Sequence, residues 1–163
     1  MAWYKRKMND KRIKICFAAS SGGHYEQIMM LKPLMEEYDS FIVTEETHYN
    51  INKTDNKTYY LKQTNRKEKG FLWNMLQNVC KSIDIYKKER PDVVICTGVL
   101  AMIPMCLIAK LMGKKLIYIE SFAKVTSPTK TGKLLYKFAD RFYVQWEHML
   151  KFYPKAIYLG GIY

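Results

Sequence analysis

Short apolar runs alternate with amphipathic stretches along the chain, and this alternation predicts strands and helices in turn. Runs rich in apolar and β-branched residues predict strands over residues 12–19, 40–44, 58–61, 92–97, 115–119, 141–145 and 156–159. Apolar residues three or four positions apart predict helices over residues 24–37, 70–89, 100–112, 131–139 and 146–152. Strands that alternate with helices form βαβ units. The pattern therefore predicts an α/β fold with a parallel sheet and helices on both faces.

Three segments that could carry chemistry follow predicted strands directly. They cover residues 20–24, 97–98 and 120–127. In open parallel sheets, ligands bind beyond the carboxyl ends of the strands. We therefore expect these segments to converge on one site at that edge of the sheet.

The first of these segments reads Ser20-Ser21-Gly22-Gly23-His24. Its two glycines permit a sharp turn and a close approach of a ligand to the backbone, and the N-terminus of the following helix attracts an anion. Because an imidazole titrates near neutral pH, His24 is a candidate hydrogen-bonding or basic group. The glycine spacing matches neither dinucleotide-binding nor P-loop signatures. The segment fits equally well a tight turn in which His24 only begins the helix.

Another candidate is Glu120, which ends an apolar strand. A carboxylate in that position is costly to bury without a partner. Glu120 is therefore expected to bind a sugar hydroxyl, to act as a base, or to serve as a structural cap or ion-pair member. The basic segment 124–137 after it fits a phosphate site or a solvated helix face.

The composition adds a strong positive charge to this picture. The chain has 163 residues and a formal net charge of +12, with 48% hydrophobic and 14% aromatic residues. This apolar content excludes a disordered polycation, so the charge lies on a folded body and favours an anionic partner. The aromatic residues do not interleave with the basic ones as in a nucleic-acid stacking platform. We therefore expect no nucleic-acid partner.

The basic charge includes an N-terminal arm, residues 1–11, ahead of a single domain over residues 12–163. Trp3, Tyr4, Lys5, Arg6 and Lys7 suit the interface of an anionic membrane, although a disordered solubilising tail has a similar composition. The longest uncharged run, residues 93–109, is interrupted by polar, glycine and proline residues. We therefore expect no transmembrane segment.

Cysteine and histidine spacing bears on metals and on the compartment. The four cysteines, Cys16, Cys80, Cys96 and Cys106, include no C-x-x-C pair. The histidines do not complete a zinc pattern with them. We expect buried, reduced thiols in a cytosolic protein and no metal site.

The motifs resemble one protein family. The run S-S-G-G-H-Y-E-Q resembles the S-G-G-H-x-x-E signature of Alg14-like polysaccharide biosynthesis proteins. A longer match begins with I-E-S-F-A-K-V at residue 119, continues with T-G-K-L-L-Y-K-F-A-D-R-F-Y-V-Q-W and ends with A-I-Y-L-G at residue 160. The resemblance covers nearly the whole chain from Lys11 onward. After the central strand, however, the glycine-rich segment of the family keeps only Gly98 and Pro104.

The resemblance implies a Rossmann-like fold equivalent to the N-terminal half of a GT-B glycosyltransferase. It implies a subunit that binds a polyprenyl-pyrophosphate-linked sugar acceptor, and an Alg13-like partner that binds most of the UDP-sugar donor. The setting it implies is capsule or exopolysaccharide synthesis, peripheral to the cytoplasmic face of the membrane. No metal or other cofactor is implied, because GT-B enzymes stabilise the leaving diphosphate with helix N-termini and side chains.

The resemblance also assigns roles to individual residues. It implies catalytic roles for His24 and Glu120, with His24 either assisting deprotonation of the acceptor hydroxyl or only positioning it. The residues implied to bind the acceptor are Ser21, Gly22, Gly23, Gly98 and Ser121. A non-catalytic membrane scaffold that recruits and stabilises the catalytic partner is the alternative.

Overall fold

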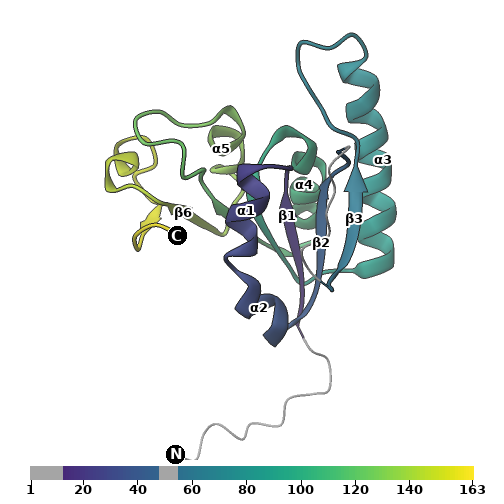
Figure 1. Cartoon of the computed structure of the whole chain (residues 1–163), viewed down its shortest axis with the longest axis horizontal. Helices are drawn as coiled ribbons and strands as arrows, with labels where there is room; N and C mark the ends of the chain where they lie inside the picture. Colours follow the sequence, from purple (N-terminus) through teal and green to yellow (C-terminus); the bar gives the residue numbers. More distant parts are fainter. Residues whose placement is uncertain (1–12, 48–54) are drawn as a thin grey trace, which may run out of the picture.

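The computed structural model describes residues 13–47 and 55–163, which form an α/β unit around one parallel sheet (Figure 1). Its strands are β1 (Lys14–Ala19), β2 (Asp39–Glu45), β3 (Lys57–Leu61), β4 (Val93–Gly98), β5 (Lys115–Ile119), β6 (Arg141–Val144) and β7 (Ile157–Tyr158). The order across the sheet is β3-β2-β1-β4-β5-β6-β7, and every pairing is parallel. The predicted parallel sheet is therefore confirmed.

The helices cover both faces of the sheet. One face carries α1 (Gly23–Met29) and α2 (Lys32–Glu37), and the other carries α3 (Phe71–Glu89), α4 (Ile103–Leu111) and α5 (Lys130–Leu135). Two 3₁₀ turns complete the elements, η1 (Leu100–Met102) and η2 (Glu147–Lys151). None of the helices in the described parts of the chain is long and apolar enough to cross a membrane.

Alternation along the strands builds two cores. In β1, Ile15, Phe17 and Ala19 pack towards α1 and α2, whereas Cys16 and Ala18 pack towards α3 and α4. This follows from the pleat, which points successive side chains to opposite faces. Because both faces are covered, the central strands are apolar almost throughout.

The single helix predicted over residues 24–37 is in fact two helices. α1 ends at Met29 and α2 begins at Lys32, with Pro33 in its first turn. Proline has no N–H to donate, and inside a continuous helix its ring would clash with the carbonyl four residues earlier, that of Met29. The break at Leu31 places Pro33 where a helix tolerates it.

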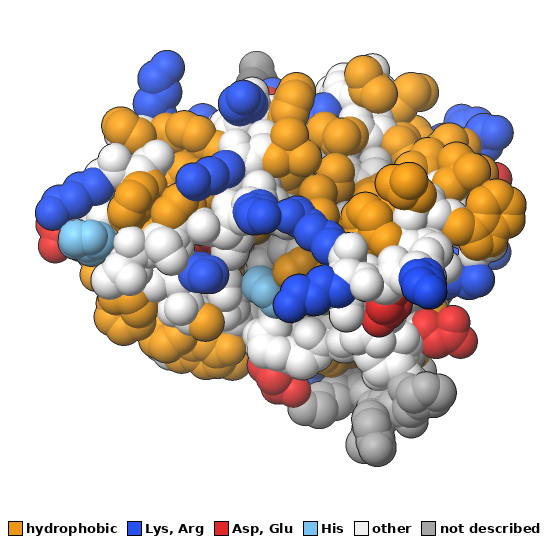
Figure 2. All heavy atoms as spheres, turned by 90° about the horizontal axis from the view of Figure 1, so that it is seen from above, with side chains coloured by type: hydrophobic (Ala, Val, Ile, Leu, Met, Phe, Trp, Pro, Cys, Tyr) orange, Lys and Arg blue, Asp and Glu red, His pale blue; other side chains and the backbone are white. Residues whose placement is uncertain are grey.

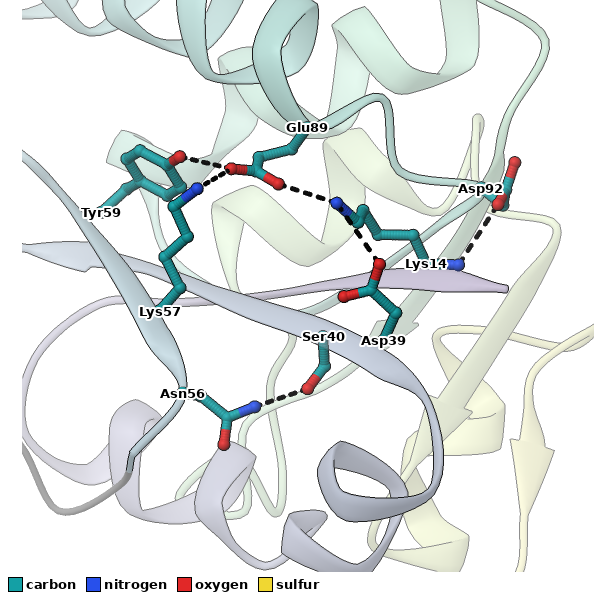
Figure 3. A network of polar contacts seen from close by, with 8 residues as sticks. All are labelled: Lys14, Asp39, Ser40, Asn56, Lys57, Tyr59, Glu89 and Asp92. Atoms are coloured by element: carbon teal, nitrogen blue, oxygen red, sulfur yellow. Dashed lines mark hydrogen bonds and ion pairs between the residues drawn. The ribbon is translucent and has the colours of Figure 1, made fainter. Parts of the chain in front are cut away.

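A polar network closes the amino-terminal edge of the sheet (Figure 3). At the end of α3, the Glu89 carboxylate accepts hydrogen bonds from Lys14 Nζ at 2.9 Å, from Lys57 Nζ at 2.5 Å and from the Tyr59 hydroxyl. Burial alone would raise the pKa of Glu89, but these donors outweigh burial and lower the pKa to about 2. Next to it, Asp92 accepts a hydrogen bond from the backbone of Lys14. This network ties α3 to β1 and β3 at the edge opposite the predicted site.

Candidate functional site

The predicted site segments lie where the direction of the sheet order reverses. The chain passes from β1 to β2 on one side, while β4 lies on the other side of β1. At the carboxyl ends of these two strands, the backbone N–H of Ser20 donates to the carbonyl of Gly98 at 2.9 Å. Such a switch point is where doubly wound sheets bind ligands. Figure 2 looks onto this edge and shows a hollow with Lys and Arg side chains beside it.

The turn after β1 is open on its outer side. Gly22 has φ 73°, a left-handed conformation that favours glycine. A Cβ at Gly22 or Gly23 would meet no atom within 4 Å. Behind the turn, the buried carboxylate of Glu45 at the end of β2 accepts hydrogen bonds from the backbone N–H groups of Ser21 and Thr64. Burial raises the pKa of Glu45, and those hydrogen bonds oppose the change. Glu45 therefore holds the turn in place from below.

His24 and Tyr118 meet at Gly98 from two sides. A Cβ built on Gly98 would lie 3.3 Å from Nδ1 of His24 and 3.5 Å from the hydroxyl of Tyr118. Both of these polar atoms are buried, and neither forms a hydrogen bond of good geometry, although the Thr129 side chain interacts with the Tyr118 hydroxyl. Gly98 also has φ 112°, so a side chain there would be strained as well as crowded. We call this arrangement of His24, Gly98 and Tyr118 the polar cradle. It places two buried polar atoms with free hydrogen-bonding capacity beside a glycine.

The environment keeps both cradle side chains neutral. Burial lowers the pKa of His24, although a hydrogen bond with the backbone of Thr97 and the negative charge of Glu120 oppose this. The Thr97 hydroxyl donates to the carbonyl of His24 at 2.9 Å, which fixes the first turn of α1 against β4. Burial raises the pKa of the Tyr118 hydroxyl well above its usual value. The cradle thus presents a neutral imidazole and a hydroxyl that stays protonated.

Glu120 does not join the cradle, and its contacts are those of the structural cap that the sequence analysis allowed; its catalytic role stays a prediction. Its side chain is 1% exposed. Oε1 accepts from the Ser121 N–H and the Thr129 hydroxyl, both at 2.9 Å, and Oε2 accepts from the Tyr153 hydroxyl at 2.6 Å. A carboxylate with these partners is satisfied and shielded from the cleft. Glu120 therefore anchors the segment after β5 to the start of α5.

The surroundings of Glu120 show how closely this anchor is packed. A Cβ on Gly132 would lie 2.1 Å from Oε2 of Glu120, so α5 can approach the carboxylate only at a glycine. Ser121, expected to contact the acceptor, is buried, and its N–H is used on Glu120. Its acceptor contact stays a prediction.

A second buried polar bridge escaped the sequence analysis. Gln145 Nε2 donates to the carbonyl of Glu120 at 2.8 Å and to Oε1 of Gln27 at 3.3 Å, and the Ile162 N–H donates to Gln145 Oε1. This bridge joins α1, β5, β6 and the C-terminal tail. Both glutamines stand inside the motifs that carried the family resemblance. A polar side chain at the end of an apolar strand was the signal that could have identified Gln145.

Two further expectations concern the N-terminal arm and metal binding. Trp3, Tyr4, Lys5, Arg6 and Lys7 lie outside the described residues, so the membrane contact assigned to them stays a prediction. Within residues 13–47 and 55–163, no three His, Cys, Asp or Glu side chains come together as a metal site would require. The part of the site described above is built from hydrogen-bonding groups alone.

Sequence comparison identifies related proteins. A family model described as "Oligosaccharide biosynthesis protein Alg14 like" matches residues 15–162. The UDP-N-acetylglucosamine transferase subunit ALG14 of Homo sapiens is 27% identical over 179 residues, covering 92% of this chain and 83% of the human protein. The corresponding subunit of Schizosaccharomyces pombe is 44% identical over 75 residues, covering 43% of this chain and 36% of its own.

Solved structures with the same fold are about twice as long. MurG of Acinetobacter baumannii superposes with a TM-score of 0.68 at 16% identity, covering 83% of this chain and 42% of MurG. UDP-N-acetylglucosamine 2-epimerase of Rickettsia bellii superposes with a TM-score of 0.71 at 13% identity, covering 93% of this chain and 46% of the epimerase. The chain thus spans less than half of each. The expected Rossmann-like fold is confirmed.

Proposed function

Because the chain belongs to the Alg14-like family of oligosaccharide biosynthesis proteins, we propose that it is the acceptor-binding subunit of a two-component glycosyltransferase. An Alg13-like partner supplies most of the site for a UDP-sugar donor such as UDP-N-acetylglucosamine. The acceptor is a sugar linked to a polyprenyl pyrophosphate, and the chain binds it peripherally at the cytoplasmic face of the membrane. The product feeds capsule or exopolysaccharide synthesis.

The observation that carries this proposal is the polar cradle. His24 Nδ1 and the Tyr118 hydroxyl are buried without a hydrogen bond of good geometry, and unsatisfied buried polar atoms are costly unless a ligand completes them. Because Gly98 has no side chain, both atoms approach the same point of the backbone. An acceptor hydroxyl at this point would complete both atoms, because its proton would face a neutral imidazole and its oxygen a phenolic donor.

The cradle also suits the reaction. The acceptor hydroxyl gives its proton to His24 as its oxygen bonds to the anomeric carbon of the donor sugar. The bond from that carbon to the diphosphate oxygen breaks, and UDP leaves with the electron pair. A general base whose pKa lies near the working pH typically raises the rate of such a step by about a hundredfold to ten-thousandfold. The open turn at Gly22 and Gly23 gives the acceptor pyrophosphate access to backbone N–H groups.

The size of the chain supports the need for a partner. The larger chains that share its fold are more than twice the length it covers. The human relative that it spans almost fully is named a transferase subunit. On this basis the isolated chain is inactive, and the donor site is completed by the second polypeptide.

The test is reconstitution with the partner. The chain is purified with its Alg13-like subunit and assayed for transfer from UDP-N-acetylglucosamine to a lipid-pyrophosphate-linked sugar. His24→Ala should lower kcat by about a hundredfold or more while the complex persists. Because His148 is an exposed histidine far along the sequence, in η2, His148→Ala is the matched control and should leave kcat unchanged.

Two outcomes would contradict the proposal. Full transferase activity from the isolated chain would exclude a split enzyme. Unchanged activity in His24→Ala, with the complex intact, would favour the scaffold alternative, in which the chain only recruits and stabilises its partner.

A further inference from the structure

The apolar residues in the first turns of α3 do not form its buried side. The buried residues of α3 are Asn78, Ser82, Ile85, Tyr86 and Glu89. Leu72, Trp73 and Leu76 are instead 79%, 62% and 53% exposed. Leu76 follows Trp73 by three positions and Leu72 by four, so it contacts both of them along one side of the helix. We call these three side chains the α3 apolar patch.

The patch exists because α3 is longer than the sheet it covers. Its 19 residues extend about 28 Å, whereas the five residues of β3 extend about 17 Å. No residue of α3 before Asn78 is buried. Figure 1 shows the first turns of α3 rising beyond the carboxyl edge of the sheet, with the loop before them. The patch therefore lies on the same edge as the polar cradle.

A basic rim accompanies the patch. Lys62, Arg66, Lys67 and Lys69 are exposed in the loop before α3, and Glu68 is the one acidic residue of that loop. From residue 71 to residue 83, α3 carries Lys81 and no acidic residue. Among the described residues, the ion pairs found do not involve any of the four loop cations. Figure 2 shows hydrophobic side chains with Lys and Arg side chains around them on this edge.

We propose that the α3 apolar patch and its basic rim dock the chain on an anionic phospholipid surface. Exposed Leu and Trp side chains enter the headgroup–acyl boundary, and each nearby cation adds attraction to anionic lipid. Neither a polar ligand nor nucleic acid would require an exposed cluster of two leucines and a tryptophan. A protein partner would account for the apolar patch but not for the surrounding cations without ion pairs. The docked face turns the cleft towards the bilayer. The reason for docking rests on the proposed function, but the docking itself needs no sugar substrate.

The first test uses the full chain in flotation with vesicles of phosphatidylglycerol and phosphatidylethanolamine. Leu72→Gln/Trp73→Gln/Leu76→Gln should weaken binding about tenfold or more. The matched control is Leu111→Gln/Met112→Gln. It alters two exposed apolar side chains at the C-terminal end of α4, near the amino-terminal edge of the sheet. The control should bind as the unchanged chain does. Vesicles of phosphatidylcholine alone should bind the unchanged chain only weakly.

A second readout separates the patch from the N-terminal arm. Cys80 is exposed on α3, one turn beyond Leu76, whereas the other three cysteines are buried. A polarity-sensitive fluorophore on Cys80 should shift to the blue when the chain binds anionic vesicles. Vesicle binding with no shift would mean that another segment, such as residues 1–11, makes the contact, and would overturn the proposal.

The remaining outcomes are equally decisive. Vesicle binding by the triple variant equal to that of the control would overturn the proposal. So would loss of partner binding with vesicle binding intact, because the patch would then be a subunit interface. Transfer to a short-chain, water-soluble acceptor should be unchanged in the triple variant. That assay would fail only if the proposed function itself were wrong.

Discussion

Glu89→Gln tests how the amino-terminal edge of the sheet is held together. The substitution keeps the shape of the side chain and removes its charge, leaving Lys14 and Lys57 without their shared partner (Figure 3). The pKa of Glu89 is about 2 in the folded chain, against 4.5 for an unperturbed glutamate. At about 1.4 kcal/mol per pKa unit, this difference of roughly 2.5 units corresponds to about 3 kcal/mol.

The sign follows from the direction of the shift. A carboxylate with a lowered pKa stabilises the fold above its unfolded value, and this contribution is lost as the pH falls from about 4.5 towards 2. Lys57 is half exposed, so solvent screens part of the interaction. At about pH 7, we expect Glu89→Gln to lower the free energy of unfolding by about 2 to 3 kcal/mol. The difference should shrink towards zero near about pH 2.

Urea unfolding followed by circular dichroism at several pH values measures this difference. Glu36→Gln is the control, because Glu36 forms an exposed ion pair with Lys32 at 3.7 Å. Such surface pairs contribute at most about 0.5 kcal/mol. The reasoning fails if Glu89→Gln matches this control at neutral pH, or if its effect is independent of pH.

Three further predictions concern the site. Gly98→Ala should abolish most transfer, since the new Cβ would occupy the cradle 3.3 Å from Nδ1 of His24; normal activity in a folded variant would exclude the cradle. Gly132→Ala should lower the melting temperature, because its Cβ would lie 2.1 Å from the buried Glu120 carboxylate; an unchanged melting temperature would show that α5 is free to move. In the reconstituted pair, kcat/KM should fall as the pH drops through a pKa below 6.5, because burial lowers the pKa of His24 and a base acts only when neutral. This fall should be unchanged in Tyr118→Phe and absent in His24→Ala. If it persisted in His24→Ala, the assignment of the fall to His24 would be refuted.

Hydrophobic patterning predicted much of the fold because it is a local property. All seven strands appear within a few residues of their predicted bounds, and the predicted site segments do follow strand ends. The resemblance to Alg14-like proteins is confirmed over residues 15–162. The local signal was misread where Pro33 divides one amphipathic stretch into two helices.

The side of each element that is buried could not be predicted in the same way. The helical spacing of apolar residues predicted α3 correctly, but Leu72 and Leu76 are exposed. The buried side of α3 includes the polar residues Asn78 and Ser82 besides Ile85 and Tyr86. Asn78 is buried because it exchanges hydrogen bonds with the backbone of Lys62, at the end of a different strand. Cys80, expected to be buried, is exposed. It lies between Asn78 and Ser82, whose side of α3 faces the sheet.

Long-range partners decide the site. Glu120 is satisfied by Thr129 and Tyr153, which lie 9 and 33 residues away. Its role as an anchor therefore depends on how α5 and η2 pack, which no local pattern encodes. The same holds for Tyr118, which reads as an ordinary strand residue until β5 pairs with β4 and brings its hydroxyl to Gly98.

Equilibrium binding by the isolated full chain tests the central claim most directly. A short-chain polyprenyl-pyrophosphate-linked N-acetylglucosamine and UDP-N-acetylglucosamine are titrated separately into the chain without its partner. The acceptor analogue should bind, the UDP-sugar should not, and His24→Ala/Tyr118→Phe should weaken acceptor binding while the fold is retained. Tight binding of the UDP-sugar by the chain alone, with no affinity for the acceptor, would contradict the assignment of this chain as the acceptor half.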